Sequence, residues 1–319
     1  MMNDIIEKIR SYFSSLRLEE FISLIFIAIT TSGALFVGLT DLLHDHPFPG
    51  TYSLKLLRLL FSTSVLFLFF RSISSEKENQ FFIPLRDFSP FLFILVIYLN
   101  IHDTIVLLNP HDIHDSLVEY EQAIFGIQPS VWLEKFYQPW LTDWFALSYL
   151  NYYLITPILL ILLYRKHQIA AFRIVMSTTM IAYFIGFLGY IFFPASSPYQ
   201  IIQDRYSVDI WQDTSFVSTF VQFLVGLSPH RVRDAFPSMH NTITLLTMIM
   251  AWRYHRLFFW IQLPLALSLV FATVYLRYHY VVDIFAAIPV VMLAFYLTPR
   301  LQKQWQALNA NPNLKYKLS

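Results

Sequence analysis

The 319-residue sequence contains no cysteine. This absence excludes disulfide bonds, thiolate metal sites and a cysteine nucleophile. Charged residues are also scarce, at 13% of the chain, whereas soluble domains average about 25%. The formal net charge of +1 provides no basic field that would attract nucleic acid. The chain therefore lacks the surface of an ordinary water-soluble protein, and we expect no nucleic-acid partner.

Apolar residues dominate instead. Hydrophobic types make up 56% of the chain and aromatic types 18%, and the mean hydropathy is +0.51. Aromatic residues at this frequency are typical of lipid-facing helices and of belts at the membrane–water interface. A helix that crosses the hydrocarbon core needs about 20 mostly apolar residues. Eight stretches approach this requirement: 21–40, 54–70, 89–109, 144–164, 174–193, 238–252, 257–276 and 284–299.

These stretches predict an all-α polytopic membrane bundle of about eight transmembrane helices. The second stretch is weak because Lys55 and Arg58 have to extend toward the headgroups, and the sixth is short. Residues 110–142, between the third and fourth stretches, are too polar to span. We expect an interfacial amphipathic segment there, broken at Gly126 and Pro129. The predicted domains are 1–109 with three spans, 110–299 with five spans, and a polar cytoplasmic tail at 300–319.

The basic residues predict the orientation of the chain, because they are enriched in cytoplasmic segments. With eight spans and both termini in the cytoplasm, 15 of the 22 basic residues lie inside, and 14 of the 21 acids lie outside. In this arrangement His240 opens the sixth span and His279 closes the seventh. Both imidazoles are then expected at the non-cytoplasmic face.

The first motif is Phe-Pro-Ser-Met-His at 236–240. Proline fits the first position of a helix, where no backbone N–H is needed, and Ser238 can cap the helix or donate to a ligand. A helix N-terminus has free N–H groups and a partial positive charge, which favour an anion such as phosphate. His240 would lie there as a proton donor.

The second motif is Arg-Tyr-His-Tyr-Val-Val-Asp at 277–283. If this segment is helical, its spacing places Asp283 on the same face as His279. A carboxylate bonded to one imidazole nitrogen sets the tautomer and leaves the other nitrogen as a base or nucleophile. Arg277 offers a planar fork that suits phosphate oxygens.

Phosphoryl transfer needs an in-line nucleophile, a proton donor for the leaving oxygen and cations for the remaining oxygens. His279, His240 and Arg277 supply one of each. Ser238, Arg231 and Arg233 are further candidates for binding the phosphate.

Other polar residues leave alternatives open. His102 and Asp103 interrupt an apolar stretch, which favours a functional group, and a buried structural pair is as good an explanation. We retain Asp103 and Tyr199 as candidates for headgroup contact. The His-Asp-rich segment 111–115 has spacings that suit a metal, as does 44–46, but a wet polar loop explains both more simply. We expect no metal and no cofactor.

Pro-Ser-x-His followed about forty residues later by His-Tyr-x-x-Asp resembles the type 2 phosphatidic acid phosphatase superfamily, which includes lipid phosphate phosphatases and vanadium haloperoxidases. The forms Phe-Pro-Ser-Met-His and Tyr-x-x-x-His-Tyr-Val-Val-Asp are most similar to its inositolphosphorylceramide synthase branch. The resemblance covers roughly residues 110–299, including Phe-Gly-x-x-Pro at 125–129 and Phe-Pro-Ala-Ser-Ser-Pro-Tyr at 193–199. It marks 110–299 as the catalytic membrane domain.

The resemblance implies that His279 attacks phosphorus and becomes phosphohistidine, while Asp283 orients it. His240 would protonate the leaving group and then activate the acceptor, without a metal. The sequence departs from the phosphatases at Ala272 and Thr273, where they carry Ser-Arg. It also lacks their first motif: Lys166 and Arg173 have its spacing, but the following proline is missing and the predicted topology puts both on the cytoplasmic side.

These departures favour a lipid phosphotransferase, which moves a phospho-headgroup to a lipid hydroxyl in the manner of inositolphosphotransferases and sphingolipid synthases. A lipid phosphate or polyprenyl diphosphate phosphatase is the alternative, and a transporter or scaffold is a remote one. The expected partners are membrane lipids, namely a phospholipid donor with a lipid hydroxyl or water as acceptor. The short tails indicate a bacterial inner membrane protein with its active site on the non-cytoplasmic face. The pattern predicts no oligomeric state.

Overall fold

The computed structural model describes residues 16–43, 58, 60–71, 82–226 and 233–308. Within these ranges the chain is helical and has no β-strand; an isolated parallel bridge joins Ala195 and Asp234. Of the predicted site residues, Arg231 lies outside the described residues. The prediction of an all-α architecture is confirmed.

The chain divides into two compact units, 1–107 with 297–319 and 108–296. In the first unit, buried charges at the helix ends are paired, as their cost in an apolar environment requires. Arg86 Nε lies 2.9 Å from Glu20 Oε1, and Arg17 Nη2 lies 2.8 Å from Asp87 Oδ1. The helices of this unit are α2 (Leu18–Leu43), the helix Leu60–Arg71, and most of α4 (Phe82–Leu108).

The second unit holds the predicted motifs. Its helices are α5 (His114–Phe125), α6 (Pro129–Trp132), η1 (Leu133–Phe136), α7 (Pro139–Arg165), α8 (Ile169–Phe192), α9 (Pro198–Ile201), η2 (Gln203–Arg205), α10 (Phe216–Gly226), α11 (Met239–Tyr254), α12 (Arg256–Tyr275) and the larger part of α13 (Val281–Leu308). The predicted break between α5 and α6 is confirmed, because Gly126 caps α5 with a φ of 70° and Pro129 begins α6. The domain division proposed from the sequence stays a prediction.

Six of the described helices are long and apolar enough to cross a membrane: Leu18–Val37, Ile83–Leu108, Pro139–Arg165, Ile169–Phe192, Arg256–Tyr275 and Val281–Ala307. They make this a multi-pass membrane protein. The two weak stretches of the sequence correspond to shorter helices, Leu60–Arg71 and the 16-residue α11. At 1.5 Å per residue, α11 is roughly 24 Å long, less than the ~30 Å hydrocarbon core. The orientation of the chain stays a prediction.

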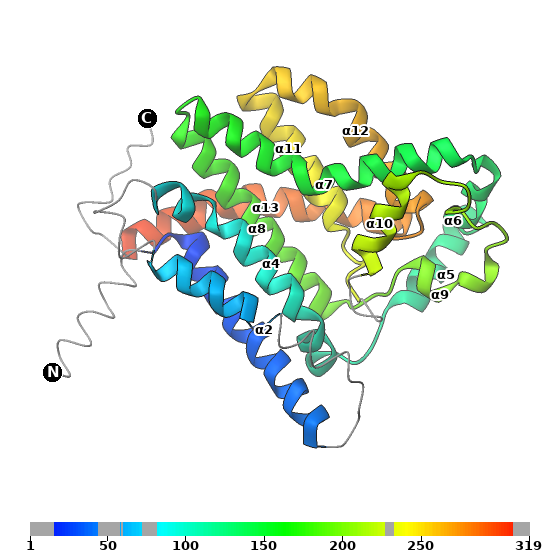
Figure 1. Ribbon diagram of the computed structural model, residues 1–319, viewed down its shortest axis with the longest axis horizontal. Helices are drawn as coiled ribbons and strands as arrows, with labels where there is room; N and C mark the ends of the chain where they lie inside the picture. Colours follow the sequence, from blue (N-terminus) through cyan, green and yellow to red (C-terminus); the bar gives the residue numbers. More distant parts are fainter. Residues whose placement is uncertain (1–15, 44–57, 59, 72–81, 227–232, 309–319) are drawn as a thin grey trace. The chain divides into compact units, whose positions relative to one another are not determined.

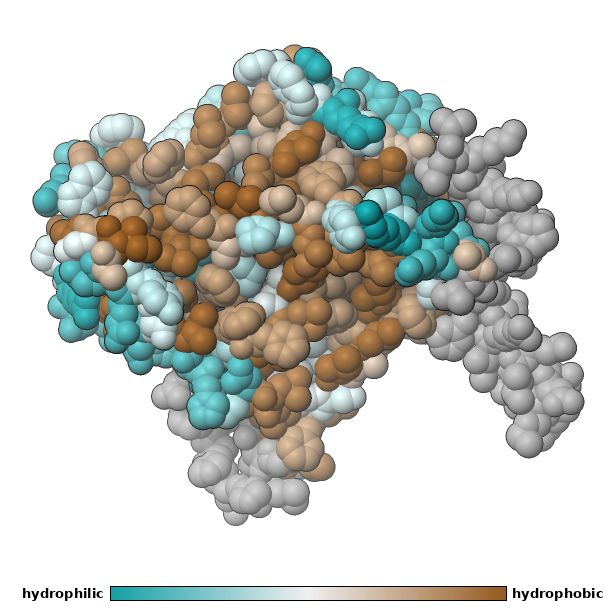
Figure 2. Space-filling view, turned by 180° about the vertical axis from the view of Figure 1, so that it is seen from behind, coloured by the Kyte–Doolittle hydropathy of each residue, from teal (hydrophilic) through white to brown (hydrophobic). Residues whose placement is uncertain are grey.

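The outer surface agrees with a membrane environment. Figure 2 shows apolar residues, drawn in brown, over much of one face of the molecule. Large apolar side chains are exposed on helices of the second unit, including Phe271 at 64%, Phe285 at 63% and Met292 at 66%. Water would penalise such exposure, whereas lipid tails accept it.

Helix α11 lies at the centre of the second unit. It packs on α7, α8 and α12, and Figure 1 shows α11 and α12 as a helical hairpin. A buried cluster beside it includes Tyr149 of α7, Ala272 of α12 and Val221 of α10. None of the eight apolar stretches falls between residues 194 and 237, yet the structure has a helix there, α10, whose 11 residues are too short to span but pack on α7.

Two glycines of α8 allow the start of α11 to approach closely. A Cβ atom at Gly189 would lie 2.5 Å from Cδ of Pro237, and one at Gly186 would lie 2.1 Å from Sδ of Met239. A larger residue at Gly189 would displace Pro237 in the segment that carries His240, whereas one at Gly186 would displace the flexible end of the Met239 side chain. Gly189 therefore sets the depth at which the first motif lies.

A buried carboxyl connects α5 to the start of α13. Glu121 is 1% exposed, and its Oε1 accepts a hydrogen bond from the backbone N–H of Val281. Burial raises the pKa of Glu121 from 4.5 to about 7, although the bond from Val281 opposes this shift. Asp283, also at the start of α13, raises the pKa further by charge repulsion.

We expect Gly189→Ala to lower the free energy of unfolding by about 1–3 kcal/mol, the usual cost of overpacking. Turnover should fall as well, because the methyl group displaces Pro237 and with it His240. Thermal unfolding in detergent micelles measures the first effect. Ala170→Ser, an exposed position on the same helix, is the control, and equal melting temperatures for the two variants would contradict the packing argument.

Glu121→Gln should flatten the pH dependence of stability between pH 4.5 and 7. In the folded protein Glu121 keeps its proton up to about pH 7, whereas the unfolded chain releases it near 4.5. The folded state therefore binds more protons in this window, and stability falls as the pH rises, by up to about 3 kcal/mol. Denaturation in micelles at pH 5 and pH 8 compares wild type and variant. Glu119→Gln, an exposed acid on the same helix, should keep the wild-type slope.

Candidate active site

His279 lies just beyond the C-terminus of α12, in a turn of defined geometry. The N–H of Tyr278 donates to the carbonyl of Thr273 at 3.1 Å, and the N–H of Arg277 donates to the carbonyl of Val274 at 3.0 Å. These two bonds form a Schellman motif, whose left-handed position is usually glycine. Here Arg277 occupies it, with a φ of 68°. A non-glycine residue costs about 1–2 kcal/mol there, so the surroundings must stabilise this conformation.

The side chain of Arg277 makes the stabilising contacts. Its Nη2 donates to Oε1 of Glu134 and to the carbonyl of Val208, each at 2.7 Å, and the guanidinium lies 3.8 Å from the centroid of the Tyr206 ring. Burial lowers the pKa of Arg277, and the charge of Glu134 opposes this effect. The structure thus places Arg277 in an ion pair facing η1 and the 206–208 segment. Its assignment as a phosphate ligand stays a prediction.

The hydrogen bonds of His279 determine its tautomer. Nδ1 lies 2.8 Å from the carbonyl oxygen of Ala235 and 3.3 Å from Oδ2 of Asp283. Both oxygens only accept, so Nδ1 carries the ring proton. Nε2 of the neutral ring is then left with a lone pair. His279 is 4% exposed, which limits the competition from water for these bonds.

Asp283 and Ala235 are themselves held in place. Oδ2 of the fully buried Asp283 also accepts the N–H of Tyr280 at 2.8 Å, so the carboxylate caps the helix on which it lies. The N–H of Ala235 donates to the carbonyl of Ala195 at 2.9 Å. Both acceptors of the His279 proton therefore have backbone supports.

His240 faces His279 from the first turn of α11. Its Nδ1 lies 3.1 Å from Nε2 of His279. The ring of Tyr149 stacks on the His240 imidazole at 4.4 Å, and the ring of Tyr152 lies at 4.2 Å. Nε2 of His240 is buried and has no hydrogen-bond partner in the described part of the chain. The two histidines and Asp283, which the sequence motifs single out, are thus brought together, with His279 in contact with both of the others.

Ser238 is a structural cap in this geometry. It is fully buried, and its Oγ accepts from Nδ2 of Asn241 at 2.9 Å and from the N–H of Asn241 at 3.4 Å. Its predicted contact with phosphate would have to come from its remaining hydroxyl proton. That assignment stays a prediction.

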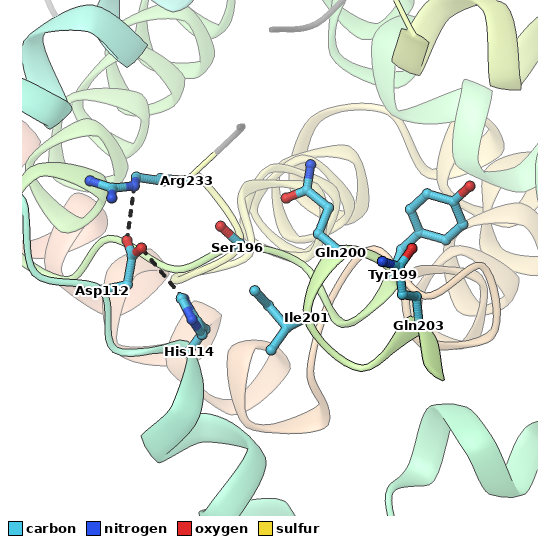
Figure 3. A pocket seen from close by; sticks show the side chains of 8 residues that line it. All are labelled: Asp112, His114, Ser196, Tyr199, Gln200, Ile201, Gln203 and Arg233. Carbon is cyan, nitrogen blue, oxygen red and sulfur yellow. Dashed lines mark ion pairs between the residues drawn. The ribbon is translucent and has the colours of Figure 1, made fainter. Parts of the chain in front are cut away.

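Two of the other predicted ligands have ion-pair partners outside the histidine pair. Nε of Arg233 pairs with Oδ1 of Asp112 at 3.0 Å, and Figure 3 shows both with Tyr199 around one pocket of about 460 Å³. Asp103 belongs to the other compact unit, where it lies 3.6 Å from Nη1 of Arg58. The assignments of Arg233, Tyr199 and Asp103 stay predictions.

The histidine of the 111–115 segment at position 114 lies near two carboxylates. His114 lies 3.6 Å from Asp112 and 3.8 Å from Asp115. No group of three or more potential metal ligands occurs among the described residues. The 44–46 segment lies outside them.

Lys166, which the sequence excludes as a residue of the first phosphatase motif, lies just beyond the end of α7, where its Nζ is 3.0 Å from Nε2 of His255. At 1.5 Å per residue, it lies roughly 20 Å from Tyr152 along the axis of α7.

Several residues of the site had no signal in the sequence. Ala235 acts through its backbone carbonyl, which any residue would supply. Glu121 and Glu134 lie in a polar segment whose acids all look solvent-exposed. Tyr149 and Tyr152 are three positions apart on an apolar helix. This spacing places both rings on one face of the helix, but it does not indicate that they contact His240.

The arrangement can perform paired acid–base and nucleophilic chemistry. One imidazole has a fixed tautomer with a lone pair on Nε2, and the second imidazole lies within hydrogen-bond distance of that lone pair. Nucleophile, proton carrier and orienting carboxylate are the three parts that covalent catalysis requires. Both histidines lie close to helix N-termini, which favour an anionic substrate.

Comparison with family models identifies the chemistry. The model of the PAP2 superfamily, the type 2 phosphatidic acid phosphatases, matches residues 115–297, more than half of the chain. Comparisons with curated proteins and with solved structures find no match. The superfamily predicted from the two motifs is confirmed, whereas the inositolphosphorylceramide synthase branch stays a prediction. The protein belongs to the PAP2 superfamily, and it is an enzyme of this group of membrane phosphatases and phosphotransferases that act on lipid phosphates.

Proposed function

We propose that the protein is a lipid phosphotransferase that moves a phospho-headgroup from a phospholipid to a lipid hydroxyl through a phosphohistidine at His279. The observation that carries this proposal is the contact of His279 Nε2 with His240 Nδ1 at 3.1 Å, while Nδ1 of His279 bonds to Ala235 and Asp283. The Nε2 lone pair of a histidine whose tautomer is fixed is suited to attack phosphorus once substrate replaces its contact with His240.

In the first half-reaction the donor phosphate binds at Nε2 of His279, and the His240 imidazole gives up its 3.1 Å contact with that nitrogen to face the leaving oxygen. Nε2 of His279 forms a bond to phosphorus, and the bond from phosphorus to the lipid oxygen breaks. The leaving oxygen takes a proton from His240, which starts as an imidazolium beside the anionic phosphate. Asp283 stabilises the positive charge that develops on the ring of His279.

The second half-reaction reverses these roles. His240 removes the proton of the acceptor hydroxyl, the acceptor oxygen bonds to phosphorus, and the bond from phosphorus to His279 breaks. The partial positive charge at the N-terminus of α11, where His240 lies, supports binding of an anionic phosphate. Ser238, Arg277, Arg231 and Arg233 remain the candidate side-chain ligands of the phosphate.

Water as acceptor would make the same site a phosphatase, the alternative function. The ring of Tyr149, stacked on His240, and the ring of Tyr152, tilted against it, favour the transferase, because they shield the proton carrier from water. Thr273 supports the same choice: the phosphatases have arginine there, whereas its Oγ1 here accepts a hydrogen bond from Asn241. The charge count supports a site on the non-cytoplasmic face of the membrane.

Purified protein given a headgroup-labelled phospholipid should transfer the label to ceramide or diacylglycerol. The labelled product should depend on the acceptor, and release of the phospho-headgroup into water should be the slower reaction. Thin-layer chromatography of products with and without acceptor measures both. Label found only in water, whichever acceptor is present, would establish the phosphatase alternative. Inhibition by vanadate, which imitates five-coordinate phosphorus, is expected in either case, and vanadate resistance would contradict both functions.

His279→Ala should abolish turnover and the acid-labile phosphoprotein formed with labelled donor. Asp283→Asn should slow turnover by roughly 10⁴-fold without unfolding the protein, because an amide can stabilise the wrong tautomer. Stopped-assay rates and acid lability of the label check these effects. His167→Asn, at a left-handed position that asparagine tolerates, is the control. If the His279→Ala variant turned over at the wild-type rate, His279 would not be the nucleophile and the proposed mechanism would be wrong.

A further inference from the structure

We propose that Glu121 of α5 is a positioning residue of the active site, which acts in its uncharged form and keeps the Asp283 carboxylate directed at His279. This role rests on the proposed function, since His279 has to be the nucleophile, and it is the same for a lipid hydroxyl or water as acceptor. Glu121 accepts the N–H of Val281, a residue 160 positions away. It therefore acts through the backbone that follows His279 and not by contact with the substrate.

Two carboxyls share the N–H groups at the start of α13. The first N–H groups of a helix have no partner within the helix. Oδ2 of Asp283 accepts the N–H of Tyr280 at 2.8 Å, and Oε1 of Glu121 accepts the N–H of Val281. Asp283 is 0% exposed and Glu121 is 1% exposed, so water does not replace either acceptor. Each carboxyl satisfies an N–H that the other leaves.

Asp283 is a competitor for the N–H that Glu121 occupies. Its Oδ2 lies 3.3 Å from Nδ1 of His279, whereas its Oδ1 is buried and has no hydrogen-bond partner in the part of the chain that the structure describes. Without Glu121, the N–H of Val281 would be a buried donor without a partner, which is costly. The Asp283 carboxylate would then rotate toward Val281, and its bond with His279 would weaken. Glu121 prevents this rotation by occupying the donor.

The helix that carries Glu121 also contacts the other support of the catalytic ring. Leu117, one turn before Glu121, belongs to a buried cluster with Ala235 and Tyr280. The carbonyl of Ala235 accepts from Nδ1 of His279 at 2.8 Å. Helix α5 therefore contacts the residues on both sides of the His279 ring proton, and a shift of α13 relative to α5 would change the geometry of that proton.

Glu121 holds this position without charge. Two neighbouring carboxylates repel each other when both ionise, and burial makes either charge costly. Burial, and to a smaller extent repulsion from Asp283, raise the pKa of Glu121 from 4.5 to about 7, against the opposing bonds from the backbone of α13. Asp115 and Glu119, the other acids of α5, are exposed to water. Below about pH 7 the carboxyl of Glu121 is therefore neutral.

The neighbouring groups do not compensate a charge on Glu121. Tyr206 and Tyr280 interact electrostatically with it, and a phenol supplies no positive charge. Arg277 is the cation of the catalytic turn, and its guanidinium is paired with Glu134 at 2.7 Å. Above about pH 7, ionised Glu121 would therefore repel the second carboxylate at the start of α13 and move it away from the catalytic ring.

Turnover at pH 6 and pH 8.5 tests this role in wild type, Glu121→Gln, Glu121→Leu and Glu119→Gln. Glu121→Leu removes the acceptor, so kcat at pH 6 should fall by roughly 10- to 100-fold, as misplacement of a catalytic group by about 1 Å does, with KM nearly unchanged. Glu121→Gln keeps an acceptor oxygen and should restore kcat at pH 6. Because its amide does not ionise, its kcat should fall about tenfold less than that of wild type between pH 6 and pH 8.5.

The controls separate this effect from other causes. Ionisation of His240 affects all four proteins and cancels in the ratio of their profiles. Glu119→Gln removes an exposed acid of the same helix and should follow wild type at both pH values. An equal fall of kcat in wild type and Glu121→Gln, or a wild-type kcat in Glu121→Leu, overturns the proposal. A loss in Glu121→Gln at pH 6 as large as that in Glu121→Leu also overturns it.

Proton NMR in micelles separates this inference from the proposed function. A ring proton bonded to a carboxylate resonates far downfield, and His279→Ala identifies the signal of His279. Glu121→Leu should move this signal upfield, as Asp283→Asn does, whereas Glu121→Gln should keep it. In wild type the signal should also move between pH 6 and pH 8.5. These shifts support the role of Glu121 even if no lipid receives phosphate. An unchanged signal in Glu121→Leu and in wild type at pH 8.5 overturns it and leaves the transferase proposal standing.

Discussion

The bond between Nδ1 of His279 and the carbonyl oxygen of Ala235 is the contact on which the rest of the site depends. A backbone carbonyl can only accept, so this bond, with that of Asp283, places the ring proton on Nδ1. The nucleophilic lone pair is then directed to Nε2, which faces His240. Because Ala235 is bonded to Ala195, the tautomer of the catalytic ring is determined by the pairing of two connecting segments rather than by the carboxylate alone.

The turn that carries His279 has a second support, at Arg277. A left-handed arginine in place of glycine is tolerated because its guanidinium pairs with Glu134 and stacks on Tyr206. Oxygens of Glu134 also accept from the N–H groups of Ser207 and Val208. The carboxylate therefore joins three parts of the chain that are distant in sequence, and it is compensated by a cation in a part of the protein where an unpaired charge would be costly.

Much of the site could be predicted, because its residues lie in short local patterns. Pro-Ser-x-His predicts a histidine in the first turn of a helix, and His-x-x-x-Asp predicts a carboxylate beside an imidazole; the structure brings His240, His279 and Asp283 together as these patterns indicate. The role suggested for Arg277 rested on residue type alone. The sequence contains no indication of the direction in which a guanidinium points, and here it lies against Glu134, 143 positions away.

The sequence alone determined that the chain is a helical membrane protein and that it belongs to a phosphoryl-transfer superfamily. Hydrophobicity and the spacing of residues within a motif are local properties, so they can be read from the sequence without knowledge of the fold. Tertiary structure decided which carbonyl sets the tautomer of His279, which acids are buried, and which polar side chains line one pocket. These depend on contacts between segments far apart in the chain, and their energies arise only when packing removes water from both partners.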